Sequence, residues 1–266
     1  MGISFIGGGV MAEALIRGII KADIAQPDEV IVSEPVSDRR DFLECEFGIR
    51  TVEQNRSILD AKGLIVLAVK PQTLPYIFPD LSENIEDTRG VASIVAGASS
   101  QAIKDGLSHE SVIRIMPNTP AQIGQGMSVW TATTQVSESD KRTVGRILKT
   151  LGDEYYVDDE KYIDMATALS ASGPAYVFLF IEAMIDSGVY LGMSRDMARR
   201  LVLQTVLGSA ELVKQSAKHP AELKDMVTSP AGTTIEALVS MENDGFRAAI
   251  IDGVRAAYDR SVELGG

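Results

Sequence analysis

The first twelve residues constrain the fold of this chain more than any other stretch. An apolar run from Gly2 to Ile6 leads directly into three glycines, and an apolar helical pattern follows them. Gly7, Gly9 and Ala12 have the G-x-G-x-x-G/A spacing, in which the first glycine turns the chain and the second admits a pyrophosphate to the backbone. The alanine lets the helix pack close to the strand. The sequence therefore predicts a strand, a turn and a helix whose N-terminus binds a dinucleotide.

Further along the chain, apolar segments alternate with helical patterns. The uniformly apolar runs are typical of strands buried in a parallel sheet, and two later segments are also predicted as strands. This alternation predicts an α/β fold with an N-terminal Rossmann-type doubly wound parallel sheet in residues 1–158. An all-helical C-terminal domain is expected in residues 159–266. The predicted strands after the first are Glu29–Ser33, Ile49–Val52, Leu64–Val69, Val91–Val95, Val112–Met116, Met127–Thr131 and Glu154–Val157.

The helical half contains one segment that a single chain cannot easily cover. Residues 175–188 are apolar almost all round in their first two turns, so this helix should be buried on every side. Two other long helices are predicted, at Met197–Lys214 and at Thr234–Glu263 with a break near Asn243. About 100 residues of helix around such a segment predict a homodimer or a higher homo-oligomer formed through the C-terminal helices.

Composition narrows the class of chemistry. The formal net charge of −12 argues against nucleic acid or an anionic membrane as a partner. The longest uncharged apolar run, Ala175–Ile181, is too short to span a bilayer, and a cytoplasmic protein without a signal peptide is expected. Cys45 is the only cysteine and is expected to pack in the core, while His109 and His219 are expected in surface loops. No metal site is therefore predicted, and a cofactor must supply the chemistry.

The end of the second predicted strand bears on the choice of cofactor. Glu34 follows this strand, where an acidic residue can accept hydrogen bonds from the adenosine ribose 2′-OH. Arg39 and Arg40 come soon afterwards and could instead bind a 2′-phosphate. The alternative for all three is a solvated helix start, so the sequence admits NADPH or NADH.

Two stretches in the second half combine small residues with hydroxyls. One covers residues 167–176, and the other covers residues 224–237. In the second, Ser229 is predicted as an N-cap and Pro230 as the first helical residue. Hydroxyls around a helix N-terminus can form an anion pocket, although an ordinary capped helix would look the same.

On these motifs the chain resembles the pyrroline-5-carboxylate reductases, the enzymes of the last step of proline biosynthesis. The resemblance covers essentially the whole chain, and the motifs of the second half are the specific ones. The motifs that carry it are Phe5–Gly9, Leu67–Pro71, Met116–Pro120, Leu169–Tyr176, Leu223–Asp225 and Thr228–Thr234.

The resemblance implies reduction of L-1-pyrroline-5-carboxylate to L-proline by hydride transfer from NAD(P)H. It implies Thr167 as the catalytic candidate that relays or orients a proton. The substrate residues that it implies are Glu160, which faces the ring, and Ser229, Gly232, Thr233 and Thr234, which hold the carboxylate. The cofactor residues are Ile6, Gly7, Gly8, Gly9, Val10, Met11, Glu34, Asn55, Ala68, Val69, Lys70, Pro71, Ala96 and Asn118.

Two positions depart from the family pattern, and two other functions compete. Glu34 stands where many relatives carry Ser, and Met226 stands where some carry Asn, which affects the expected cofactor contacts. One rival is an oxidoreductase like the β-hydroxyacid dehydrogenases, which use a lysine on the central helix. Residues 174–191 contain no lysine. The other rival is a non-catalytic NAD(P)-sensing protein.

Overall fold

The computed structural model of the chain describes residues 2–59, 63–82, 85 and 90–265. By compactness it divides into two units, which are described separately. Unit 1 comprises Met1–Ser172 together with Ala257–Gly266, and unit 2 comprises Gly173–Ala256.

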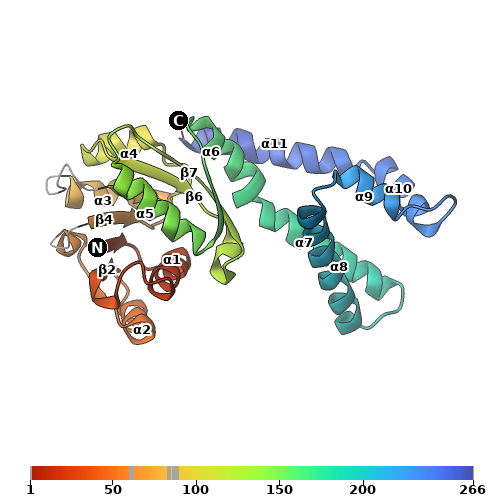
Figure 1. Cartoon of the computed structure of the whole chain (residues 1–266), viewed down its shortest axis with the longest axis horizontal. Helices are drawn as coiled ribbons and strands as arrows, with labels where there is room; N and C mark the ends of the chain where they lie inside the picture. The colour runs from red at the N-terminus through yellow and green to blue at the C-terminus, as the bar shows by residue number, and fades with distance from the viewer. Residues whose placement is uncertain (1, 60–62, 83–84, 86–89, 266) are drawn as a thin grey trace. The chain divides into compact units, whose positions relative to one another are not determined.

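Unit 1 is built on an eight-stranded sheet of order β3-β2-β1-β4-β5-β6-β7-β8 (Figure 1). The first six strands are parallel, and β7 pairs antiparallel with β6. The predicted doubly wound sheet is therefore confirmed, with the last two strands reversed. The strands are β1 (Gly2–Ile6), β2 (Val30–Ser33), β3 (Arg50–Val52), β4 (Gly63–Leu67), β5 (Val91–Ser93), β6 (Val112–Met116), β7 (Gly126–Ala132) and β8 (Gly152–Tyr156).

Helices cover both faces of this sheet, as alternating strands and helices require. One core joins the sheet to α1 (Val10–Lys21), α2 (Ser37–Phe47) and α5 (Glu138–Lys149). The opposite core joins it to α3 (Leu74–Leu81) and α4 (Ser100–Leu107). A smaller cluster packs α6 (Lys161–Ala166) against the β6 and β7 residues Met116 and Val129. The predicted ligand-binding segments therefore follow strands that are packed against helices on both faces of the sheet.

Short helical turns connect several of these elements. In the described part of the chain, four of them are 3₁₀ helices and one is a π-helical turn between α6 and α7. The four 3₁₀ helices are η1 (Pro27–Glu29), η2 (Asn55–Ile58), η3 (Pro71–Thr73) and η4 (Thr119–Ile123), and the π turn is η5 (Thr167–Ala171).

Unit 2 is helical, which confirms the predicted character of the C-terminal half. Its helices are α7 (Gly173–Tyr190), α8 (Arg195–Ser216), α9 (Pro220–Met226), α10 (Thr233–Asn243) and most of α11 (Phe246–Gly265), whose last turns belong to unit 1. The break predicted near Asn243 separates α10 from α11.

The helical run Lys161–Tyr190 is long and apolar enough, by length and composition alone, to cross a membrane. The expectation that the apolar stretch is too short to span a bilayer was wrong, because isolated charged residues around Ala175–Ile181 leave a longer window apolar. Only 6% of the most apolar 18-residue window is buried within the chain. The core helix of a soluble oligomer has the same composition, so this run needs a cover of some kind rather than a membrane specifically.

Candidate active site

The turn after β1 lies where the strand order reverses. β1 pairs with β2 on one side and with β4 on the other. The Gly7 N–H donates to the Ser33 carbonyl at 2.8 Å, and the Ala68 N–H donates to the Ile6 carbonyl at 2.9 Å. The carboxyl ends of three strands therefore meet, which is the crevice where open α/β sheets bind ligands. The structure brings three predicted cofactor segments together here, namely Ile6–Met11, Glu34 and Ala68–Pro71.

The glycine turn is shaped to admit a pyrophosphate. Gly7 has φ +94°, and a Cβ there would lie 2.6 Å from the Ala68 carbonyl oxygen, so a side chain is excluded. A Cβ on Gly9 would meet no atom within 4 Å. Gly9 is the N-cap of α1 and offers no side-chain cap, and the first intrahelical bond is donated by Glu13. The N–H groups of residues 10–12 are therefore available to an anion, which fits the phosphates of NAD(P)H.

Glu34 is already bonded to this turn. Its Oε2 accepts the Gly8 N–H at 2.9 Å, and its Oε1 accepts the Val36 N–H at 3.1 Å. The carboxylate thus lies beside the glycines at the end of β2, which is where the ribose hydroxyl of a dinucleotide is expected.

The two arginines near Glu34 are engaged by the protein. Arg39 donates from Nε to the Gly8 carbonyl at 2.6 Å and from Nη2 to Glu13 Oε2 at 2.7 Å. Arg40 donates from Nη1 to the carbonyls of Glu34 and Pro35. Partial burial raises the pKa of Glu13, but hydrogen bonds from Arg39 and Arg17 outweigh it and lower that pKa below its usual value. Glu13 therefore stays ionised and compensates the charge of Arg39.

Asn55 lies next to the same edge. Its Oδ1 accepts the hydroxyl of Ser33 at 2.7 Å, and its Nδ2 donates to Asp80 Oδ2 at 3.0 Å. Ser33 is the last residue of β2, so Asn55 is fixed close to Glu34. The resemblance placed Asn55 on the adenosine side, and its location at the end of β2 is compatible with that prediction.

The remaining predicted cofactor residues follow the next two strands. Ala96 follows β5 and is exposed, and Asn118 follows β6. The Asn118 side chain is occupied, because Oδ1 accepts the Met127 N–H at 2.9 Å and Nδ2 donates to the Ser170 carbonyl and hydroxyl, each at 3.3 Å. Asn118 thus ties the end of β6 to the π turn that contains Ser170.

Thr167 begins that π turn. Its hydroxyl donates to the Ile163 carbonyl at 2.7 Å, one turn back along the helix. The donated proton is therefore in use, and the oxygen keeps lone pairs that can accept. Isolated π turns inside helices occur frequently at functional sites.

Glu160 precedes α6 and has a buried partner that the sequence analysis missed. Its Oε1 accepts from Arg114 Nη1 at 2.7 Å and from the Ser100 N–H at 2.7 Å. Arg114 is 2% exposed and lies in the middle of β6. The sequence does contain a signal for this partner, since Arg114 is the single charged residue in the otherwise apolar run Val112–Met116.

The predicted carboxylate residues gather in unit 2, at the start of α10. The predicted helix start was wrong: Gly232 is the N-cap and Thr233 the first helical residue. The reason is a turn, in which Ala231 has φ +55° and the Gly232 N–H donates to the Ser229 carbonyl at 3.1 Å. The hydroxyl of Ser229 still lies against Gly232. The N-cap of α10 makes no side-chain hydrogen bond to the helix, and the helix begins with Thr233 and Thr234. Such a helix start is compatible with the predicted anion site.

Comparison with known proteins decides the family. Residues 160–264 match the sequence model described as pyrroline-5-carboxylate reductase dimerisation, and residues 2–97 match one described as NADP oxidoreductase, coenzyme F420-dependent. The chain is 44% identical to a pyrroline-5-carboxylate reductase of Synechocystis sp., over 99% of this chain and 98% of that protein. It belongs to the pyrroline-5-carboxylate reductase family.

Solved structures of the family agree. The Coxiella burnetii pyrroline-5-carboxylate reductase superposes with a TM-score of 0.90 at 33% identity, over 100% of this chain and 98% of that one. A Plasmodium falciparum pyrroline carboxylate reductase solved with NADP bound gives 0.87 at 33% identity, with coverages of 100% and 98%. The predicted family, its Rossmann-type fold and an oxidoreductase that uses NAD(P)H are confirmed.

Two expectations about reactive side chains were wrong. His109 is buried, at 3% exposed, rather than in a surface loop. Cys45 is exposed rather than packed, because α2 buries only Leu43 of its residues. In this reductase neither residue lies in the segments that form the candidate site.

We expect Glu34 to make NADH at least as good a cofactor as NADPH. A carboxylate beside a 2′-phosphate repels it, and a charge-assisted hydrogen bond to a ribose hydroxyl contributes about 1.5–3 kcal/mol. Glu34→Ser should therefore lower kcat/KM with NADH by about 10-fold or more and raise it with NADPH. The measurement is the ratio of kcat/KM for the two cofactors before and after the change.

The control for this prediction is Glu138→Ser, which removes the same charge from the exposed start of α5. It should leave the ratio unchanged. A strong NADPH preference that survives Glu34→Ser would show that Arg39 and Arg40 decide the choice.

Proposed function

We propose that this reductase reduces L-1-pyrroline-5-carboxylate to L-proline with NAD(P)H. The named relatives along the whole chain support the reaction. The observation that carries the assignment of the substrate site is the uncapped start of α10, where the helix begins with Thr233 and Thr234 and the Ser229 hydroxyl lies against Gly232. A cyclic imine that carries a carboxylate needs such an anion site, and its ring carbon accepts a hydride without a metal.

The residues of the chain bind, orient and exclude water. The N–H groups at the start of α10 hold the carboxylate, and the hydroxyls of Ser229 and Thr234 donate to it. Thr167 donates to Ile163, so its oxygen accepts the N–H of the protonated imine and orients it. The turn at Gly7–Gly9 fixes the cofactor phosphates, and NAD(P)H, when bound, supplies the hydride.

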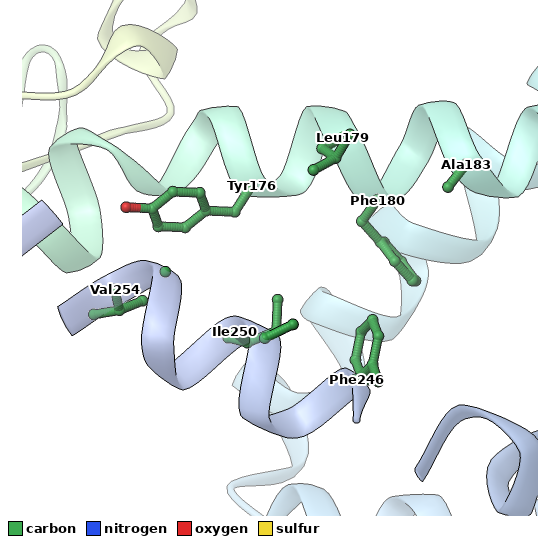
Figure 2. Close-up of a pocket in the computed structure, with 9 residues that line it drawn as sticks. Tyr176, Leu179, Phe180, Ala183, Phe246, Ile250 and Val254 are labelled. Carbon is green, nitrogen blue, oxygen red and sulfur yellow. The ribbon is translucent and has the colours of Figure 1, made fainter. Parts of the chain in front are cut away.

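A second copy of the chain completes the protein. Unit 2 contains an apolar groove of about 370 Å³ between α7 and α11. Figure 2 shows Phe180 of α7 pointing toward Phe246 of α11, and Tyr176, Leu179 and Ile250 line the same groove. This groove lies in the region that matches the dimerisation model. We therefore propose that the C-terminal helices form a homodimer or a higher homo-oligomer, in which a second copy covers the run Lys161–Tyr190. The enzyme is further proposed to be cytoplasmic, without membrane or nucleic-acid partners.

The purified chain should oxidise NADH or NADPH only when the cyclic imine acid is present. Ser229→Ala and Thr234→Ala each remove a donor to the carboxylate, which costs about 1–3 kcal/mol, so the KM for the imine acid should rise about 5- to 150-fold. The KM for the cofactor should stay constant. With 1-pyrroline, which lacks the carboxylate, both variants should match the unmodified enzyme.

Thr150→Ala serves as the matched control, because its hydroxyl bonds to the Ile147 carbonyl in unit 1. It should leave both KM values unchanged. Variants that shift only the cofactor KM would show that the carboxylate site is misassigned. Turnover of a 3-hydroxy acid with NAD would favour the β-hydroxyacid dehydrogenase rival, and cofactor binding without any turnover would favour a sensor.

A further inference from the structure

Arg114 is a charged side chain on an interior strand of the sheet. It lies in β6, is 2% exposed, and donates from Nη1 to Glu160 Oε1 at 2.7 Å and from Nη2 to Asp164 Oδ1 at 3.0 Å. The two carboxylates are four residues apart, so they lie on one face at the start of α6. The planar guanidinium of Arg114 therefore binds carboxylates from two successive turns at the start of α6.

Each carboxylate also accepts a second hydrogen bond from another element. Glu160 Oε1 accepts the N–H of Ser100, the first residue of α4, at 2.7 Å. Asp164 Oδ1 accepts the hydroxyl of Ser261, in the last turns of α11, at 3.1 Å. The network thus joins β6, α4, α6 and the end of α11 within unit 1.

Stability alone is a poor explanation for this arginine. Removing ions from water costs several kcal/mol each, and apolar residues of similar volume often replace a buried ion pair without loss. In addition, Arg114 Nε is buried without a hydrogen-bond partner among the described residues. What the guanidinium provides, and an apolar side chain would not, is a fixed direction for α6.

The same strand also holds the other end of this segment. Asn118, two residues beyond β6, donates to Ser170 in the π turn. Thr167 lies between the two attachments, three residues after Asp164 and three before Ser170. Arg114 and Asn118 therefore fix both sides of the residue to which the proposed function gives the orienting role.

We propose that Arg114 is a positioning residue for imine reduction: it holds Glu160 and Asp164, and through α6 it sets the location of the Thr167 hydroxyl. The inference rests on the proposed function of Thr167. It concerns the geometry of the reacting ring, because the glycine turn that binds the cofactor phosphates lies after β1, on a different strand.

The test compares Arg114→Met and Arg114→Lys with the unmodified enzyme. Arg114→Met should lower kcat for the imine acid at least 10-fold, while the Kd of NADH, measured by fluorescence without turnover, changes less than twofold. Arg114→Lys keeps the charge but loses the fork, so it should recover part of kcat. Leu148→Ala is the matched control. Leu148 is buried in the core around α5, so its truncation should lower Tm while leaving the contacts of α6 in place. It should keep kcat at temperatures where it is folded.

Asp164→Asn provides a milder variant if Arg114→Met does not fold, and it too should lower kcat with the Kd of NADH unchanged. Variants whose kcat falls no further than that of Leu148→Ala at an equal loss of Tm would overturn the positioning role. So would an equal loss of kcat and of NADH affinity. Absence of imine reduction by the unmodified enzyme would instead contradict the proposed function itself.

Discussion

Gly9→Ala should abolish tight cofactor binding and leave the fold intact. A Cβ at this position meets nothing within 4 Å, and Gly9 has φ −66°, which alanine adopts freely. The same Cβ points into the space at the start of α1 where a pyrophosphate must approach the backbone. We expect the Kd of NADH to rise by about 100-fold, roughly 2.7 kcal/mol, with Tm unchanged. Equilibrium fluorescence titration and thermal unfolding measure the two quantities.

Gly7→Ala is the informative comparison, because there the residue is fixed by the protein itself. Its positive φ costs an alanine about 1–2 kcal/mol. The clash with the Ala68 carbonyl, 2.6 Å from the added Cβ, comes on top of that cost. This variant should lose both Tm and cofactor affinity. Gly208→Ala, on α8 with its nearest neighbour at 3.9 Å, should lose neither. If the Gly9→Ala enzyme binds NADH with normal affinity, the pyrophosphate does not bind at this turn and the prediction is wrong.

Leu179→Glu should convert the enzyme to a monomer at micromolar concentration. Leu179 is 68% exposed in the single chain and lines the apolar groove of unit 2, so the folded chain tolerates the change. In a dimer it would bury a carboxylate without a partner and lose the burial of a leucine, itself about 1.5–3 kcal/mol. In a symmetric dimer the substitution occurs at two equivalent positions, so its free-energy cost is counted twice. The Kd of the dimer should therefore rise more than 1,000-fold. Sedimentation analysis across a concentration series measures it.

The control is Tyr76→Glu, at an 80% exposed position on α3 in unit 1. It adds the same charge outside the dimerisation region and should leave the oligomer intact. A Leu179→Glu protein that keeps the oligomeric mass of the unmodified chain would place the interface elsewhere. If the unmodified chain is itself monomeric at micromolar concentration, the proposed homo-oligomer fails.

The sequence determined the elements of unit 1 because their signals are local. The glycine spacing after β1, the apolar runs and the helical periods each depend on neighbouring residues, and all eight strands were predicted within a few residues. Two strands end early: β4 ends at Leu67 and β5 at Ser93. The residues predicted to continue these strands, up to Val69 and Val95, lie beyond the ends of the observed strands. They lie instead at the carboxyl edge of the sheet, where ligands of such folds bind.

What only the tertiary structure decided is which polar groups meet. Glu34 bonds to Gly8, 26 residues away, and Arg114 bonds to Glu160, 46 residues away. No periodicity encodes such pairs, because they depend on strand order and on which helix covers which face. The start of α10 was also not predicted correctly from the sequence. The left-handed conformation of Ala231 interrupts the chain after Ser229 and Pro230, so the helix begins only at Thr233. The sequence thus gives the scaffold and the residue types of the site, while long-range packing selects the hydrogen-bond partners that orient them.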